Sequence, residues 1–187
     1  AVYSPLQTYA SQSNQKIGII GVGGLGHLAI QFARALDYEV TAISSSPEKK
    51  EQSIAFGADH FIDSNNQTNM DESEYNFDFL LCTASNNVNW ERLLSTLKKN
   101  GTMILVGFPD VKLNSTDLVV HQLSIKGSFL GNRATMQEML FFAEKYNIKP
   151  KLEMMPMTKV NEAMQKVKEG KARYRIVLEN DINVTEG

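Results

Sequence analysis

The chain has 187 residues, 42% hydrophobic and 21% charged, an ordinary composition for a globular protein with one good-sized core. Its formal net charge of −2 argues against a nucleic acid or an anionic membrane as partner, and its single cysteine, Cys82, excludes an internal disulfide framework and fits a reducing compartment. The sequence has no apolar run long enough to cross a bilayer and opens on Ala1 without a charged-then-apolar leader, so we expect a cytoplasmic protein, processed or cut from a longer one.

A glycine cluster follows the first predicted strand. A strand is predicted at residues 17–20, and a helical pattern of apolar residues runs on to Leu36. Between them stand Gly21, Gly23, Gly24, Leu25 and Gly26. Strand, glycine turn and helix form the arrangement that binds a dinucleotide pyrophosphate. We predict that the first glycine permits the tight turn, the second lets backbone N–H groups approach the phosphates, and the last lets the helix pack closely on the strand.

Strands and helices alternate along most of the chain. Further strands are predicted at residues 40–43, 60–62, 77–82, 103–106 and 123–129, and helices at 46–57, 90–101 and 135–146. The polar stretch 64–76 is predicted to be a loop, with a helical turn as the alternative. Six strands with helical crossovers predict an α/β fold, a doubly wound parallel (Rossmann) sheet with strand order 3-2-1-4-5-6.

The chain divides into three parts by the character of its residues. We expect a lead-in helix at 1–15 and the nucleotide-binding Rossmann domain at 16–149. Residues 150–187 form a C-terminal appendage, with an extended segment before Pro156, a short helix at 160–169 and a strand at 172–179.

Three serines stand where nucleotide sites of this kind usually place an acid that binds the adenosine ribose. They are Ser44, Ser45 and Ser46, followed by Pro47 at the first helical position and by Lys49. An acid would repel a 2′-phosphate, whereas hydroxyls, a helix N-terminus and a lysine would attract it. The pattern therefore predicts NADP over NAD, by about 10- to 100-fold. In the alternative interpretation the serines only cap the helix and the lysine is a solvated surface charge.

Several further motifs can be read together with the glycine cluster. They are His27 next to the cluster and the segments 44–49, 57–60, 106–109, 126–129 and 172–176. In combination these motifs resemble the zinc-dependent medium-chain alcohol dehydrogenases, in particular their NADP-dependent cinnamyl alcohol dehydrogenase branch. The resemblance covers essentially the whole chain and implies hydride transfer between NADP(H) and an alcohol and its aldehyde.

The resemblance also implies roles for individual residues. Gly23, Gly24 and Leu25 would contact the pyrophosphate, and Ser44, Ser45 and Lys49 would bind the 2′-phosphate. Thr83 would lie along the cofactor, and Gly107 and Ser128 would approach its nicotinamide end. Arg175 would contact the pyrophosphate from a second side. In the alternative interpretation Arg175 is an outward-facing strand charge. We expect His27 to cap or pack rather than to catalyse. His60, His121 and Cys82 lack metal-ligand spacing and are expected to be structural.

The chain departs from this family in one large respect. Family members begin with a catalytic domain that supplies the zinc ligands and a four-cysteine structural zinc lobe, and neither is present in the sequence. The resemblance implies that the chain starts just after the last zinc ligand and that residues 150–187 return to the missing domain. We therefore expect zinc in the parent enzyme only, no catalytic or metal-binding residue in this chain, and negligible dehydrogenase activity for the fragment, whose alcohol or aldehyde the sequence does not identify.

Two other functions are compatible with a nucleotide fold. The first is a non-catalytic module that senses or binds NADPH. The second is a methyltransferase with a nucleoside-like cofactor, although such sites also favour an acid where Ser44 stands.

The family resemblance further implies a homodimer that pairs its sixth strands, within residues 122–129, and the alternative is a protected monomer edge.

Overall fold

The computed structural model describes residues 1–9, 14–74, 76–85 and 88–181. The chain forms two compact units, Ala1–Ile148 and Lys149–Gly187, which are described separately. In the part of the chain that the structure describes, no helix is both long and apolar enough to cross a membrane.

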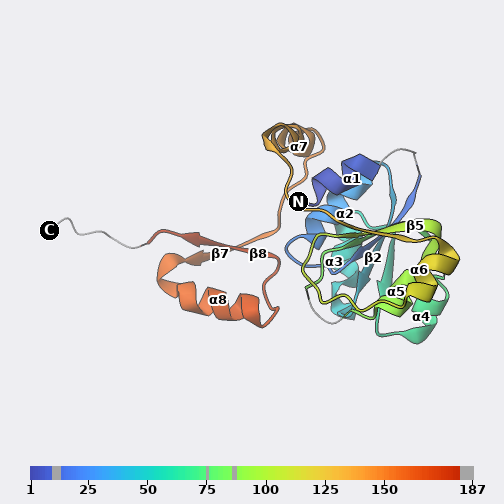
Figure 1. Ribbon diagram of the computed structural model, residues 1–187. Helices are drawn as coiled ribbons and strands as arrows, with labels where there is room; N and C mark the ends of the chain where they lie inside the picture. The colour runs from blue at the N-terminus through green and yellow to red at the C-terminus, as the bar shows by residue number, and fades with distance from the viewer. Residues whose placement is uncertain (10–13, 75, 86–87, 182–187) are drawn as a thin grey trace. The chain divides into compact units, whose positions relative to one another are not determined.

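A six-stranded parallel sheet forms the centre of the first unit (Figure 1). Its strands are β1 (Lys16–Ile20), β2 (Glu39–Ser44), β3 (His60–Asp63), β4 (Phe77–Cys82), β5 (Leu97–Leu105) and β6 (Ser124–Gly127). They are hydrogen-bonded in the order β3-β2-β1-β4-β5-β6, which confirms the predicted doubly wound Rossmann topology. The strand order reverses between β1 and β4, and ligands of such sheets bind beyond the carboxyl ends of the strands at this point.

Helices cover both faces of this sheet. The helices that contact its strands are α2 (Gly26–Ala35), α3 (Lys50–Ala55), α4 (Gln67–Asp71), α5 (Trp90–Ser95) and α6 (Ser115–His121), and a 3₁₀ turn, η1 (Pro47–Lys49), precedes α3. Outside this layer, α1 (Tyr3–Tyr9) contacts α2, and α7 (Arg133–Lys145) contacts α1. On one face Ile20 packs in a buried cluster with Leu94 of α5 and Met70 of α4. Strand side chains alternate between faces, so Ile19 lies on the opposite face, where α2 contacts β1 and β2. Both faces are therefore buried, which explains the nearly continuous apolar runs of the central strands.

The boundary between α5 and β5 differs from the sequence prediction. The helix expected to reach Gly101 ends at Ser95, and β5 already begins at the buried Leu97. Phe77 pairs with Leu97, but Phe79 pairs with Thr102, so β5 bulges between its two paired segments. Asn100 in this bulge has a φ of +65°. The prediction was wrong because Leu97 continues the apolar spacing of the helix although it belongs to the next strand.

Two short helices go beyond the main predicted elements, and of these only α4 lies where a helical turn was an alternative. The helix α4 occupies part of the stretch expected to be a loop, and its N-cap Asn66 accepts a hydrogen bond from the N–H of Asn69. Likewise, Asn114 caps α6 by accepting from the N–H of Thr116. Each helix is too short to show a helical repeat of apolar residues, and in α4 only Met70 is buried.

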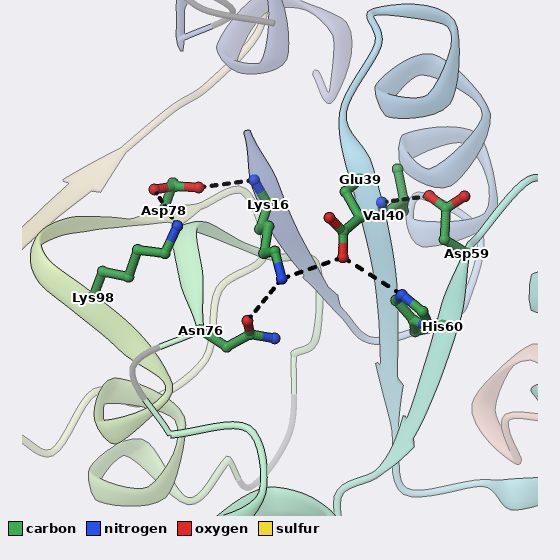
Figure 2. Close-up of polar contacts among 8 residues, drawn as sticks. All are labelled: Lys16, Glu39, Val40, Asp59, His60, Asn76, Asp78 and Lys98. Carbon is green, nitrogen blue, oxygen red and sulfur yellow. Dashed lines mark hydrogen bonds and ion pairs between the residues drawn. The ribbon is translucent and has the colours of Figure 1, made fainter. Parts of the chain in front are cut away.

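Charged side chains join neighbouring strands at the amino edge of the sheet (Figure 2). The first residue of β1, Lys16, donates its backbone N–H to Asp78 Oδ2 at 2.8 Å, and Lys98 Nζ lies 2.9 Å from Asp78 Oδ1. The Lys16 Nζ lies 3.5 Å from Glu39 Oε1, the first residue of β2. His60 Nε2 of β3 lies 3.5 Å from the same carboxylate oxygen.

A second carboxylate at this edge binds the main chain in the same way. Asp59 precedes β3, and its Oδ2 accepts the backbone N–H of Val40 at 2.8 Å, while its Oδ1 lies 3.0 Å from Arg34 Nη1. Strand N–H groups at this edge are thus satisfied by side-chain acceptors, as buried or half-buried main-chain donors require.

The second unit is a small parallel β-α-β motif. It consists of β7 (Leu152–Pro156), the 3₁₀ turn η2 (Met157–Lys159), α8 (Val160–Lys168) and β8 (Arg175–Glu179). Met155 of β7 and Ala163 of α8 are buried, whereas the alternate strand residues Leu152 and Met154 are about half exposed, at 49% and 50%. The two-stranded sheet therefore presents one apolar face that the described residues of this unit do not cover.

Candidate dinucleotide-binding site

The glycine turn between β1 and α2 has a geometry that requires glycine at two positions. Gly21 has a φ of +87°, a conformation that side chains with a Cβ rarely adopt, and its N–H donates to the carbonyl of Ile43 at 2.9 Å. At Gly26, the first residue of α2, an added Cβ would lie 1.9 Å from the Gly21 carbonyl oxygen. The start of α2 thus packs so closely on the turn that a side chain at Gly26 would not fit, in agreement with the predicted role of this glycine.

Two side chains, one after β4 and one in α2, contact carbonyl groups of this turn. Thr83 follows β4, and its hydroxyl donates to the Gly21 carbonyl at 2.8 Å. His27 is completely buried, with its Nδ1 2.9 Å from the Gly23 carbonyl and its ring centroid 5.5 Å from that of Phe56. The prediction that His27 caps or packs is confirmed.

In the serine run at the end of β2 (Ser44, Ser45 and Ser46), Ser44 makes hydrogen bonds to two neighbouring N–H groups. This residue is buried, its Oγ accepts the N–H of Ser46 at 3.2 Å, and its carbonyl accepts the N–H of Ser64 at 3.0 Å. Ser46 stands at the N-cap of η1, yet its side chain makes no capping hydrogen bond. That geometry weakens the interpretation in which the serines serve only as a helix cap. The Lys49 N–H donates to the Ser46 carbonyl at 3.1 Å, which closes the turn.

The parallel sheet brings most of the predicted site residues to one edge. The glycine cluster follows β1, the serines end β2, Thr83 follows β4, and Gly107 and Ser128 follow β5 and β6. The N–H of Gly107 donates to the Cys82 carbonyl at 3.1 Å, and that of Ser128 donates to the Leu105 carbonyl at 2.8 Å. Arg175 is the first residue of β8 in the second unit, so its contact with a pyrophosphate stays a prediction.

The carboxyl edge of the sheet fits a dinucleotide. A Cβ added at Gly23 would meet no protein atom within 4 Å, so the turn has open space beside it. The ten-residue helix α2 begins at this turn, and the positive end of a helix dipole attracts phosphate oxygens. No group of three or more His, Cys, Asp or Glu side chains among residues 1–9, 14–74, 76–85 and 88–181 could hold a metal ion.

Asn65 is a residue of this edge that the sequence motifs do not reveal. It lies in the turn between β3 and α4, and its Nδ2 donates to the carbonyl of Ser45 at 2.8 Å. No motif spacing pointed to it, because it stands in a polar run far from the serines in sequence.

The sheet order, the glycine turn and the serine run define a doubly wound nucleotide-binding fold. The family model for zinc-binding dehydrogenases matches residues 24–145, and the chain belongs to that family. The chain is also 38% identical over 184 residues to an aldehyde reductase of Synechocystis sp., a match that covers 97% of this chain and 55% of the relative. These findings confirm the resemblance to zinc-dependent alcohol dehydrogenases.

Solved structures agree with this assignment. A cinnamyl alcohol dehydrogenase from Sorghum bicolor superimposes with a TM-score of 0.93 at 32% identity, over 98% of this chain and 54% of that one. An acetophenone reductase from Geotrichum candidum, solved with NAD, gives a TM-score of 0.86 at 30% identity, over 97% of this chain and 53% of that one. A cinnamyl alcohol dehydrogenase from Helicobacter pylori, solved with NADP(H), gives 0.84 at 28% identity, over 95% and 51%. The chain spans about half the length of the proteins it matches.

Proposed function

We propose that this chain binds NADP(H) along the carboxyl edge of its six-stranded sheet, as part of a zinc-dependent dehydrogenase that interconverts an alcohol and its aldehyde. The glycine turn at 21–26 would hold the pyrophosphate, and Ser44, Ser45, Ser46 and Lys49 would bind the 2′-phosphate. Family membership and the relatives named as aldehyde reductase and cinnamyl alcohol dehydrogenase support the reaction class. A free, buried Cys82 is compatible with a cytoplasmic location.

One observation carries the choice of NADP over NAD. The strand β2 ends in Ser44 rather than in an acid, and this hydroxyl already accepts the N–H of Ser46. A hydroxyl has one proton to donate, so Ser44 can offer it to a phosphate oxygen. Hydrogen bonds to a charged phosphate are stronger than those between neutral groups, whereas an acid at this position would repel it.

The residues of the chain position the cofactor and hold the shape of its site. When bound, NADPH supplies a hydride from its nicotinamide ring. Thr83 fixes the carbonyl of Gly21 and His27 fixes that of Gly23, so the N–H groups of the turn are aligned before the ligand arrives. Gly107 and Ser128 lie past the ends of β5 and β6, in the position proposed for the nicotinamide end.

Calorimetric titration of the 187-residue chain with NADPH and with NADH tests the cofactor choice. We expect NADPH to bind about 10- to 100-fold more tightly. Equal binding, or tighter binding of NADH, would contradict the proposal. A Ser44→Asp variant should reverse the preference, because its carboxylate repels a 2′-phosphate and accepts from a free 2′-hydroxyl.

A second proposal concerns turnover by the chain alone. Because the described residues contain no group that could hold a metal, we expect the 187-residue chain to bind NADPH but to leave cinnamyl and benzylic aldehydes unreduced. The measurement is NADPH oxidation followed at high protein concentration. Turnover that a zinc chelator abolishes would refute this expectation. Binding without turnover is also what a sensing module would show, and the rest of the gene would separate the two.

We also propose that the first unit forms a homodimer through β6. This strand lies at the end of the sheet and pairs only with β5 among the described strands. Apolar side chains beside it are exposed, among them Val119 at 75%, Val120 at 59%, Phe129 at 72% and Leu130 at 67%. Light scattering should give a dimer, and Val119→Asp should yield a monomer with unchanged NADPH affinity. A wild-type monomer at high concentration would contradict the proposal.

For residues 149–187 we propose two roles, burial of an apolar face by the rest of the longer protein and a contact with the cofactor. Their exposed apolar face at Leu152, Met154 and Val177 would be covered by the sequence that the longer relatives have in addition. Arg175 would contact the pyrophosphate. An Arg175→Gln variant should weaken NADPH and NADH binding to the same degree, because both ligands carry the pyrophosphate.

A further inference from the structure

The turn between β3 and α4 is hydrogen-bonded to the serine run at the end of β2. Register pairing places Ser44 beside Asp63, the last residue of β3. Asp63 Oδ1 accepts the N–H of Asn65 at 2.9 Å, and the Ser64 N–H donates to the Ser44 carbonyl at 3.0 Å. From this turn Asn65 Nδ2 reaches the Ser45 carbonyl at 2.8 Å. The proposed 2′-phosphate site thus has a second segment built against it.

The hydrogen bond from Asn65 acts on one particular peptide unit. The carbonyl of Ser45 and the N–H of Ser46 belong to the same planar peptide, and this N–H donates to Ser44 Oγ at 3.2 Å. The peptide is therefore held from both sides, by the Asn65 amide at its oxygen and by the Ser44 hydroxyl at its nitrogen. Such a chain of hydrogen bonds polarises its members in the same direction.

Fixing this peptide restricts the orientation of the Ser44 hydroxyl. Because one lone pair of its oxygen accepts from Ser46, the directions left for its proton are restricted. Ser44 is only 6% exposed, so water does not readily replace a lost partner. If the peptide between Ser45 and Ser46 could rotate, the oxygen would lose this acceptor role and the hydroxyl its orientation.

We propose that Asn65 is a positioning residue for 2′-phosphate recognition: it fixes the peptide between Ser45 and Ser46 and, through it, the hydroxyl of Ser44. This inference rests on the proposed function, since it assigns a determinant of NADP(H) binding at the same site. Asn65 need not touch the cofactor. Its contribution is to remove the cost of ordering the serine run when the phosphate binds.

A helix-capping role would be the simplest alternative for an asparagine at this place. In this turn, however, the capping side chain is that of the next residue, Asn66, which accepts from the N–H of Asn69. The Asn65 amide instead leaves its own turn and bonds to a residue 20 positions earlier. A purely structural clamp between the β2 and β3 ends would affect every adenine nucleotide alike, which separates it from the proposed role.

The experiment compares two ligands that differ only in the 2′-phosphate, adenosine 2′,5′-bisphosphate and adenosine 5′-monophosphate, by calorimetry on the 187-residue chain. The variants are Asn65→Ala, which removes the amide, and Asn65→Gln, which keeps it on a longer stem. Asn114→Ala is the matched control, because it removes an exposed asparagine that caps α6. Thermal unfolding of each variant verifies that it folds.

We expect Asn65→Ala to bind the bisphosphate about 3- to 10-fold more weakly, with less than about a twofold change for the monophosphate. Asn65→Gln should recover part of the loss, and Asn114→Ala should change neither affinity. Unchanged affinities in Asn65→Ala, or equal losses for both ligands, would overturn the positioning role while the wild-type preference stands. A wild-type chain without preference for the bisphosphate would overturn the proposed function itself, and the inference with it.

Discussion

At the amino edge of the six-stranded sheet, carboxylates bind the protein's own cations and strand N–H groups, whereas at the carboxyl edge mostly neutral groups hold the turns. Asp78 at the first edge accepts both Lys16 N–H and Lys98 Nζ. At the second edge the corresponding partners are the hydroxyl of Thr83 and the amide of Asn65. The acid of that edge, Asp63, accepts an N–H within its own turn.

This difference suits the two edges to two tasks: the paired charges of the amino edge stabilise the fold, and the mostly neutral carboxyl edge does not repel a phosphate. A charge paired within the protein gains little from a ligand, because its field is already neutralised. Neutral donors and acceptors can shape a turn without adding negative charge that would repel a phosphate. The comparison predicts that changes at the amino edge alter stability alone, and that changes at the carboxyl edge alter nucleotide binding.

The largest expected effect is that of Gly26→Ala at the carboxyl edge. Its Cβ would lie 1.9 Å from the Gly21 carbonyl, so the main chain must move. We expect a loss of about 2–3 kcal/mol in the free energy of unfolding, as overpacking of this kind produces, and undetectable NADPH binding. Urea unfolding and fluorescence titration measure the two effects. Gly127→Ala is the control for the free energy of unfolding, because its Cβ would meet nothing within 4 Å beyond its chain neighbours. A stable Gly26→Ala variant with normal affinity would break the comparison.

Gly23→Ala separates ligand binding from stability at the same turn. Its Cβ would also meet no protein atom within 4 Å, so we expect the free energy of unfolding to change by less than about 1 kcal/mol. The methyl group would occupy the space through which the pyrophosphate approaches, so NADPH affinity should fall by more than about tenfold. If Gly23→Ala bound NADPH normally, the pyrophosphate would lie elsewhere.

Asp78→Ala makes the reverse test at the amino edge. It removes the acceptor of Lys16 N–H and the partner of Lys98, and we expect a loss of about 1–2 kcal/mol in the free energy of unfolding, because a half-buried N–H is left unpaired. NADPH affinity of the folded fraction should not change. In the control, Lys98→Met breaks only an ion pair whose lysine side chain is 42% exposed, at a cost below about 1 kcal/mol. An altered NADPH affinity in Asp78→Ala would show that the two edges are coupled.

Much of the carboxyl edge could be predicted because its backbone geometry demands particular residues. Gly21 needs a positive φ and Gly26 a missing Cβ, and such requirements leave a spacing that the sequence displays. The strand order followed from the alternation of apolar strands and helices. The assignment of these residues to NADP contacts, by contrast, stays a prediction.

Features that depend on single long-range hydrogen bonds could not be predicted. Asn65 bonds to a residue 20 positions away, and Asp78 to one 62 positions away, and neither contact leaves a periodic signal. The end of α5 was misplaced for a related reason. Leu97 is buried whether it belongs to a helix face or to a strand, so apolar spacing alone does not distinguish the two.

The smallest expected effect concerns Cys82, the last residue of β4, whose side chain is fully buried. Burial raises the pKa of this thiol above its ordinary value, because the apolar surroundings disfavour the thiolate. Cys82→Ala should cost about 1 kcal/mol at pH 7 from lost packing. Because the folded pKa is the higher one, the thiol's stabilising contribution is complete below the unfolded pKa of about 8.5 and is lost as pH rises toward the folded value.

The stability advantage of wild type over Cys82→Ala should therefore shrink as the pH rises above about 8.5, because ionisation of the thiol stabilises the wild-type unfolded state. Urea unfolding of both proteins across this range measures the difference and cancels the titration of tyrosines and lysines common to both. A constant difference would mean that the thiol ionises equally in the folded chain. The edge proposed for the cofactor would then carry a negative charge at alkaline pH, and NADPH binding should weaken over the same interval.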